Sequence, residues 1–465
     1  MAKTRSQYLC QACGEIHSRW VGKCDSCNEW NTIVEDDSKQ EDDQRFNKKI
    51  KKGRPIPLVM LSEELIEEES RIQTHISELD RVTGGGFVRG SVILVGGDPG
   101  IGKSTLLMQA AASLAYKKHN ITYVSGEESI GQIRLRSQRL NTLNSSVQVG
   151  IETNVEDIIE TLLTNEKPDL VIIDSIQTLW SQIAESSPGT VIQVRTSVQL
   201  IIQYAKTNNV SMVLVGHVTK EGQIAGPRVI EHMVDAVLYF EGGTRNAQYD
   251  YRILRSVKNR FGPTDEIGVF EMSDKGLQEV SDPSKMFLSN RDSTSPGAAV
   301  FAGIEGTRAL LVEIQSLVVP TSLGMPRRTV VGWDSSRLAM ILAVLEARCK
   351  IKFGNHDVHL NVAGGYRISE PAADLAVAAA LISSIFCIPL PSSCIYFGEI
   401  SLSGDVRPVG HIQQRLKEAE KIGFLSGIFP EPSKGECKIG IIDSQHIINL
   451  SDLVQKIKSL QKKED

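Results

Sequence analysis

A glycine-rich segment between an apolar strand and a helix constrains this 465-residue chain more than any other feature. The apolar run at 92–95 leads into GDPGIGKST at 97–105, which fits the pattern G-x-x-x-x-G-K-[ST]. In such a loop, backbone N–H groups face nucleotide phosphates and the following helix N-terminus adds positive potential. The segment therefore predicts an α/β domain that binds ATP. Its expected cofactor-binding residues are Gly97, Asp98, Pro99, Gly100, Ile101, Gly102, Lys103, Ser104 and Thr105.

Two side chains of this loop have chemical roles. Lys103 would reach the β- and γ-phosphates, and the Ser104 hydroxyl would ligate Mg²⁺. We expect Lys103 to make few contacts in the empty site, so that its removal hardly changes stability. The alternative is a glycine-rich turn that binds nothing, and the strand–loop–helix context argues against it.

A second apolar strand is predicted at 170–173, and it ends at Asp174 and Ser175. An acidic residue at the end of such a strand is the Walker B pattern, and Asp174 would hold Mg²⁺ directly or through water. Many buried strands end in Asp, so the pattern is weak alone. Its position after a phosphate-binding loop and two intervening βα units makes it persuasive.

A carboxylate is also needed to orient the attacking water. The predicted strand at 121–124 is followed by Ser-Gly and then by Glu127 and Glu128. We expect this strand to lie next to the phosphate-loop strand, in a RecA-like order. Glu127 is the catalytic candidate and Glu128 the reserve. The alternative is an acidic pair at a helix N-terminus, where the helix dipole favours negative charge.

The chain as a whole divides into several segments. Short apolar runs alternate with helix-length segments from about 75 to 275, including strands at 211–215 and 236–240, as in a parallel α/β sheet. A second mixed α/β pattern contains helices at 371–385 and 413–422. The predicted domains are a zinc-binding module (1–34), a charged linker (35–74), an ATPase domain (75–280), a second linker (281–296) and a C-terminal domain (297–465).

Four of the eight cysteines form two C-x-x-C pairs, Cys10 with Cys13 and Cys24 with Cys27. Each pair lets two thiolates reach one tetrahedral Zn²⁺ from a tight turn. A dithiol redox pair or stray core cysteines do not explain two such pairs, so we predict a closed, structural zinc site. His17 is interpreted as a bystander. The remaining cysteines are interpreted as core residues: Cys349, Cys387, Cys394 and Cys437.

These features, taken together, resemble the bacterial RadA (Sms) family along nearly the whole chain. The matching elements are the zinc pairs, GDPGIGKST, VSGEES, LVIIDS, the pentapeptide KNRFG at 258–262, and a C-terminal domain similar to that of Lon protease. The resemblance implies a RecA-like core in a hexameric, DNA-stimulated ATPase. It implies action on single-stranded and branched DNA in recombination and repair, as a helicase-like motor for branch migration beside RecA.

Several basic residues fit this implied role. Lys258 and Arg260 are one residue apart at a strand end, so they point to the same side and could reach a neighbouring subunit's γ-phosphate. The segment 216–220 takes the place where RecA-like motors sense γ-phosphate, and Lys220 and Arg228 are candidate contacts to single-stranded DNA. Solvated basic turns are the alternative. The basic run at 45–54 is interpreted as a solvated linker.

The Lon-like domain lacks the residues of a peptidase dyad. In the stretch 370–374 Ala372 takes the place of the Lon serine, and Gln413 takes that of the lysine. Alanine has no nucleophile and glutamine cannot act as a base. The domain is therefore expected to serve ring assembly or duplex DNA binding. Its candidate DNA contacts are Lys350, Lys352, Arg407 and Arg415.

Composition adds limits but no function. The net charge of −5 excludes a protein that is basic all over, although a local basic surface is enough for DNA. No apolar run reaches the length of a membrane span, so we expect a cytoplasmic protein. The family resemblance implies association with the nucleoid. Two rival functions remain open: an ATP-dependent protease, disfavoured at Ala372 and Gln413, and a signalling ATPase that acts on proteins.

Overall fold

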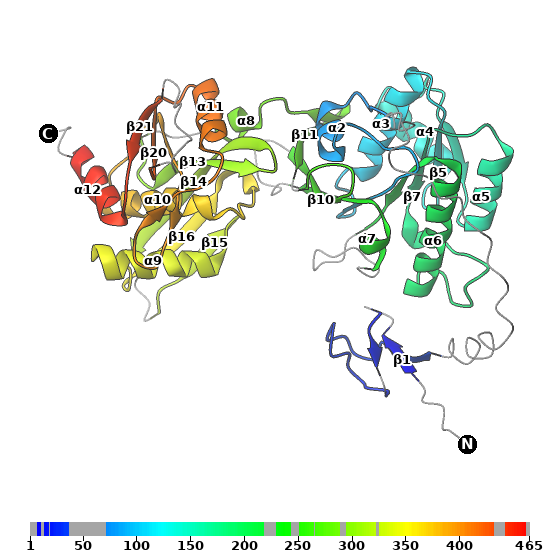
Figure 1. The fold of residues 1–465 in the computed structure, drawn as a ribbon, viewed down its shortest axis with the longest axis horizontal. Helices are drawn as coiled ribbons and strands as arrows, with labels where there is room; N and C mark the ends of the chain where they lie inside the picture. Colours follow the sequence, from blue (N-terminus) through cyan, green and yellow to red (C-terminus); the bar gives the residue numbers. More distant parts are fainter. Residues whose placement is uncertain are drawn as a thin grey trace, which may run out of the picture. The chain divides into compact units, whose positions relative to one another are not determined.

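The computed structural model describes residues 7–10, 14–17, 19–36, 71–217, 229–242, 251–264, 266–288, 294–321, 325–431 and 442–461. The chain forms two compact units, one built from 1–242 and 252–279 and the other from 243–251 and 280–465 (Figure 1). Within the described part of the chain, no helix is long and apolar enough to cross a membrane.

The N-terminal module is a three-stranded antiparallel sheet in the order β2-β1-β3. Its strands are β1 (Gln7–Cys10), β2 (Ile16–His17) and β3 (Ile33–Asp36). Its small core holds Cys10, Cys24 and Ile33. So few apolar residues cannot stabilise a fold alone, and a bound metal is the usual remedy in so small a domain.

The first unit also contains a nine-stranded sheet in the order β12-β11-β10-β9-β4-β8-β7-β5-β6. Strands β4 to β9 pair in parallel, as the alternating pattern predicted. The bounds are β4 (Val92–Gly97), β5 (Ile121–Ser125), β6 (Gln148–Ile151), β7 (Leu170–Asp174), β8 (Ser211–Val215), β9 (Ala236–Gly242), β10 (Tyr251–Asn259), β11 (Ile267–Ser273) and β12 (Gly276–Glu279).

One expectation about this sheet is wrong. Strand β5, which leads to Glu127, is not beside the phosphate-loop strand β4, because β8 and β7 lie between them. The sequence shows that both strands are buried but not which strands pair. The residues at the C-terminal ends of β4, β8, β7 and β5 nevertheless share one edge, since parallel strands present these ends together.

Helices cover both faces of this sheet. Strand β4 shows why: Ile93 and Val95 pack with α2, α3 and α4 on one face, whereas Val92 and Leu94 pack with α5 and α6 on the other. This alternation follows the two-residue period of a strand buried on both faces. The helices are α2 (Ser77–Thr83), α3 (Lys103–Tyr116), α4 (Ile130–Arg139), α5 (Val155–Thr164), α6 (Val191–Asn208) and α7 (Val229–Met233).

The second unit is built on a seven-stranded mixed sheet in the order β15-β16-β14-β13-β17-β20-β21. Its strands are β13 (Ala298–Glu305), β14 (Arg308–Pro320), β15 (Arg328–Val331), β16 (His356–Val362), β17 (Cys394–Tyr396), β20 (Ser426–Phe429) and β21 (Asp443–His446). A separate pair joins β18 (Glu399–Ile400) to β19 (Val406–Arg407). Its helices are α8 (Pro283–Leu288), α9 (Ser335–Cys349), α10 (Asp374–Phe386), α11 (Ile412–Ile422) and α12 (Leu450–Gln461).

Two further expectations need correction. The predicted linker 281–296 contains α8, whose Phe287 is buried and packs against Tyr366 of the second unit. Of the cysteines interpreted as core residues, Cys394 is buried, but Cys349 is half-buried and Cys387 is exposed at the end of α10. Cys437 lies outside the described residues.

Candidate nucleotide and metal sites

The loop 97–105 leaves β4 at the C-terminal edge of the sheet and opens α3. Gly100 and Gly102 have φ of 76° and 115°, a left-handed conformation that side chains rarely adopt. This conformation turns successive N–H groups toward one side, as a phosphate site requires. A side-chain carbon on Gly102 would also lie 2.8 Å from the terminal methyl of Met272, which would have to move, so the positive φ is the stronger reason for glycine here.

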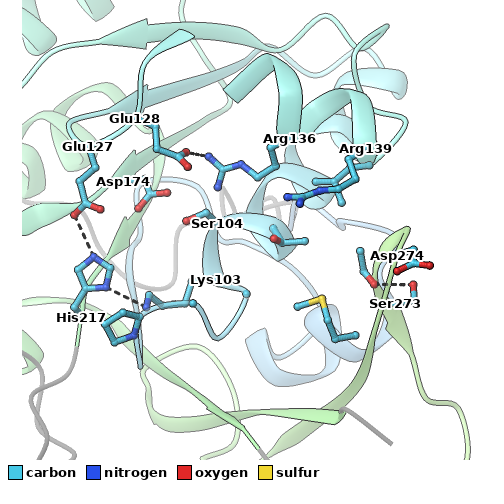
Figure 2. A pocket seen from close by; sticks show the side chains of 17 residues that line it. Lys103, Ser104, Glu127, Glu128, Arg136, Arg139, Asp174, His217, Ser273 and Asp274 are labelled. Carbon is cyan, nitrogen blue, oxygen red and sulfur yellow. Dashed lines mark hydrogen bonds and ion pairs between the residues drawn. The ribbon is translucent and has the colours of Figure 1, made fainter. Parts of the chain in front are cut away.

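A cavity of about 790 Å³ opens at this edge (Figure 2). It is lined by Pro99, Gly100, Gly102, Lys103, Ser104, Thr105, Glu127, Glu128, Arg136, Arg139, Leu140, Asp174, His217, Met272, Ser273, Asp274 and Gly276. The lining brings together Lys103 and Ser104 of the phosphate loop, Asp174 and Glu127, which lie at or after the ends of three different strands. It is large enough for a nucleotide.

Lys103 is folded back onto its own loop. Its Nζ atom donates to the carbonyls of Gly97 and Asp98, at 2.7 and 2.9 Å, and lies 3.2 Å from His217 Nδ1. Only 4% of Lys103 is exposed. This burial lowers the pKa of its ammonium, although the negative charges of Asp174, Asp98 and Glu127 act to raise it. The expectation of few contacts in the empty site is therefore wrong.

His217 follows β8 and links two of the predicted residues. Its Nδ1 faces Lys103, and its Nε2 lies 3.1 Å from Glu127 Oε1. Figure 2 shows the ring between these two side chains. A neutral ring with its proton on Nε2 donates to Glu127 and accepts from Lys103, which satisfies both partners. The sequence pointed to the segment 216–220 but not to this residue as the link.

The two candidate carboxylates have separate environments. Glu127 accepts hydrogen bonds from Ser175 and His217. Its partial burial acts to raise its pKa, but these hydrogen bonds and the positive charge of Lys103 outweigh burial and lower it. Glu128 turns instead to Arg136 of α4 and forms an ion pair with it. Glu127 is thus ionised and directed at the phosphate end, whereas Glu128 is engaged elsewhere.

Asp174 has a partner that sequence reasoning missed. The Tyr123 hydroxyl, on β5, donates to Asp174 Oδ2 at 2.6 Å and also interacts with Ser104. Burial and the neighbouring Asp174 charge raise the pKa of Tyr123 well above its ordinary value, so the phenol keeps its proton. Ser104 and Asp174, the two expected magnesium ligands, therefore both contact the same buried phenol. The pairing of Ser125 with Asp174 across β5 and β7 aligns these strands.

One side of the cavity comes from the turn between β11 and β12, which the sequence did not indicate. Gln109 of α3 holds this turn, because its side chain donates to the Leu277 carbonyl and accepts from the Leu277 N–H, both at 3.0 Å. Met272, Ser273 and Asp274 then line the cavity, and Met272 lies against the phosphate loop at Gly102.

Lys258 and Arg260 lie at the opposite edge of the sheet from this cavity. Lys258 on β10 pairs with Val237, near the start of β9, whereas the phosphate loop adjoins the end of β9 at Phe240. Lys258 Nζ donates to three carbonyls at the end of α7, those of Glu231, His232 and Val234, at 2.7–3.2 Å. Arg260 binds Asp235 at 3.0 Å. Burial and the Arg260 charge lower the pKa of Lys258.

The end of the pentapeptide is held by close backbone packing. A side-chain carbon on Gly262 would lie 3.0 Å from the Cα of Gly84, at the end of α2, and 2.9 Å from Asn259. The Asn259 amide donates to the Thr83 carbonyl at 3.3 Å. The pentapeptide is therefore fixed against α2, and glycine is required for that contact.

Three thiols of the N-terminal module converge. The sulfur atoms of Cys10, Cys24 and Cys27 all lie within 4.8 Å of one another, and Cys10 Sγ is 3.7 Å from Cys27 Sγ. A tetrahedron of thiolates at a Zn–S distance of about 2.3 Å has edges of roughly 3.8 Å. The observed separation fits zinc and is far too long for a disulfide. Cys13 lies outside the described residues.

His17 does not stand apart from this cluster. Its Nε2 lies 3.4 Å from Cys24 Sγ. A ring N–H that donates to a thiolate offsets some of the negative charge of a four-thiolate site. His17 is therefore not a bystander, as the sequence suggested, but contacts one of the cysteines of the site.

In the second unit, the positions of the missing peptidase dyad are inert. Ala372 is buried in the turn before α10, and Gln413 is exposed in the first turn of α11. Arg415, two residues further on, is only 1% exposed and binds Glu370 and the carbonyls of Ala302 and Gly410. It cannot serve as a surface contact to DNA, so that expectation is wrong. Lys350, Lys352 and Arg407 are exposed.

The remaining candidates cannot be placed. Lys220 and Arg228 lie outside the described residues, as does the charged segment 37–70. Their assignment as DNA contacts rests on the sequence alone.

Three protein families match parts of this chain. A rubredoxin metal binding domain matches residues 8–35, an AAA domain matches 61–223, and subunit ChlI of Mg-chelatase matches 319–433. With the folds described above, these matches confirm the predicted class: a zinc module, a RecA-like α/β ATPase domain and a Lon-like α/β domain. They also support the three predicted cofactors, ATP, Mg²⁺ and Zn²⁺.

Several curated proteins are similar to the chain over nearly its whole length. The DNA repair protein RadA of Brucella abortus is 63% identical over 98% of both chains. The protein of the same name from Rickettsia bellii is 50% identical over 91% of this chain and 93% of its own, and that from Bacillus subtilis is 46% identical over 92% and 93%. Among solved structures, flagellar accessory protein FlaH of Methanocaldococcus jannaschii is 17% identical, with a TM-score of 0.37 over 45% of this chain and 98% of that chain.

Proposed function

This chain belongs to the RadA family of DNA repair proteins, and from this premise we propose that it couples ATP hydrolysis to DNA binding through His217. It is an ATP-hydrolysing DNA repair protein. The finer proposal is a DNA-dependent ATPase that works in homologous recombination, as a hexameric, helicase-like ring that promotes branch migration beside RecA.

One observation carries the coupling. His217 contacts both Lys103 and Glu127, and the chain continues directly from it into the segment with Lys220 and Arg228. ATP phosphates would compete for Lys103 and so release one partner of the His217 ring. A change at the γ-phosphate would thus alter the contacts of His217, at the start of the proposed DNA-binding segment. Conversely, DNA bound to that segment would alter the contact of His217 with Glu127.

The hydrolytic step uses the residues at the phosphate end. Lys103 would bind the β- and γ-phosphates, and Glu127 would orient the attacking water. Glu127 has a lowered pKa, so it suits the positioning of water better than the removal of a proton before attack. Ser104 and Asp174 would hold Mg²⁺, which neutralises phosphate charge when bound, and Tyr123 would keep Asp174 oriented.

The proposal of a ring rests on the position of Lys258 and Arg260. These residues lie at the sheet edge remote from their own cavity, so they can act on ATP only in a neighbouring subunit. In the isolated chain they hold the end of α7 and Asp235. On assembly, one or both would turn toward the neighbour's γ-phosphate as finger residues.

The decisive measurement is the ATPase rate with and without single-stranded DNA. We expect DNA to raise turnover in the full chain, and the variant Lys220→Ala to lower that stimulation. The matched control is Lys117→Ala, because Lys117 is exposed at the far end of α3, away from the cavity. An ATPase rate that is the same with and without single-stranded DNA would refute the coupling and favour an ATPase that acts on protein partners.

Oligomeric state provides a second, independent test. Negative-stain images with ATP should show six-membered rings, and sedimentation should agree with the mass of a hexamer. A monomer that hydrolyses ATP at the full rate would remove the basis for a finger in trans. Degradation of casein would instead support the rival protease function, which Ala372 and Gln413 disfavour.

A further inference from the structure

Two large aromatic side chains of the zinc module face solvent. Trp20 is 58% exposed and Trp30 is 67% exposed. Neither belongs to the module's small core of Cys10, Cys24 and Ile33. A tryptophan ordinarily dominates the core or interface in which it is buried, so two exposed ones in so small a module indicate a binding surface.

The two rings lie beside each other over one glycine. A side-chain carbon on Gly22 would be 3.8 Å from the Trp20 ring and 3.9 Å from the Trp30 ring. The Trp20 indole N–H donates to the Ile33 carbonyl at 3.1 Å, which fixes that ring on the sheet. The backbone of Trp30 forms an antiparallel bridge with Lys23. The pair is thus held by the fold, with Gly22 leaving room between the rings.

Cations flank this pair. The Lys23 ammonium lies 5.9 Å from the centroid of the Trp30 ring. Arg19 is exposed and directly precedes Trp20. Aromatic rings with a lysine over one of them and an arginine next to the other in sequence suit a chain of bases joined by phosphates, because each base has a stacking face and each link has a negative charge. Duplex DNA presents no such faces, since its bases already stack on one another.

We propose that Trp20 and Trp30 form a stacking platform for the bases of single-stranded DNA, with Arg19 and Lys23 at the phosphates. This inference rests on the proposed function, because it requires that the chain acts on DNA. It assigns to the zinc module a contact separate from Lys220 and Arg228. The zinc site itself is closed by thiolates and takes no part in the contact.

The test compares two oligonucleotides of equal length and charge, one of deoxythymidine and one abasic. Equilibrium binding to the full-length protein should favour the deoxythymidine oligonucleotide by at least about fivefold, as expected for one stacked base. The double variant Trp20→Ala with Trp30→Ala should lose this preference while its affinity for the abasic strand stays the same. The variant with phenylalanine at both positions should keep most of the preference.

Controls separate this inference from the parent proposal. Tyr116→Ala removes an exposed aromatic residue of the ATPase domain and should keep the preference. Zinc content should be unchanged in every variant, which verifies that the module folds. Equal binding of both oligonucleotides by the unaltered protein would overturn the platform but not DNA binding. Failure to bind either would overturn both, and a double alanine variant with its preference intact would overturn the platform alone.

Discussion

The Nε2 atom of His217 lies 3.1 Å from a carboxylate oxygen of Glu127, although 90 residues separate them. The contact exists because β8 and β5 end at the same edge of the sheet, where Lys103 completes the set.

Glu127→Gln should lower ATP turnover by about 10²-fold or more, because the amide retains the size of the side chain but loses the charge that orients water. Glu128→Gln should have a much smaller effect, since Glu128 pairs with Arg136. Turnover at saturating ATP, with nucleotide binding measured separately, distinguishes the two. A larger loss of turnover in Glu128→Gln than in Glu127→Gln would mean that Glu128, and not Glu127, orients the attacking water.

His217→Ala should leave ATP binding intact and abolish most of the stimulation by single-stranded DNA, because it removes the link between Lys103 and Glu127. His217→Gln, which can still donate and accept, should restore part of the stimulation. The measurement is the ratio of ATPase rates with and without DNA. Full stimulation in the alanine variant would mean that the signal takes another route.

Lys103→Ala should bring turnover close to background, and it should also destabilise the empty protein. The change leaves the buried carbonyl of Gly97, and the more accessible one of Asp98, without their Lys103 donor. Loss of these bonds costs roughly 1–3 kcal/mol, although removal of a buried charge offsets part of this. Chemical unfolding without nucleotide checks the shift, with Lys117→Ala as control. An unchanged midpoint would indicate that the Lys103 contacts contribute nothing.

Purified protein should contain one zinc per chain, and Cys24→Ser should lose it. Structural zinc in finger peptides contributes about 10–16 kcal/mol at neutral pH, so the module should unfold. The ATPase core should persist, because its hydrophobic clusters share no residue with the module's. Cys387→Ser, at an exposed position in the second unit, should keep the metal. Metal analysis combined with thiol titration tests this prediction. Native protein that contains no metal and in which all four thiols of the module react would refute the site.

Lys258→Ala rings should bind ATP but hydrolyse it about 10³-fold more slowly, as expected when a finger cation is lost. Mixing separates this role from support of α7 within the same chain. Lys103→Ala subunits retain the finger and Lys258→Ala subunits retain the phosphate loop, so mixed rings should regain activity at some interfaces. Confirmed mixed hexamers without recovery would leave Lys258 as a purely structural residue.

The contiguous features of the two sites could be predicted from sequence. The phosphate loop, the acidic end of β7 and the paired cysteines each need only neighbouring residues, because turn conformation and ligand spacing are set within a few positions. The five predicted strands of the parallel sheet were found for a similar reason: runs of four or five apolar residues are buried on both faces wherever they pair.

Only the tertiary structure decided which of these segments meet. Pairing between strands is a long-range choice, so the separation of β5 from β4 could not be predicted, nor the donor that Tyr123 supplies to Asp174. The sequence marks Arg415 as a charged residue of an amphipathic helix. In the fold, Glu370 and two backbone carbonyls compensate that charge, and this compensation allows its burial. The sequence thus determined which reactive and ligating groups this protein contains. The packing of distant strands and helices decided where these groups come together. The physical reason is that contacts between distant residues form only when the apolar faces of the whole chain are buried together.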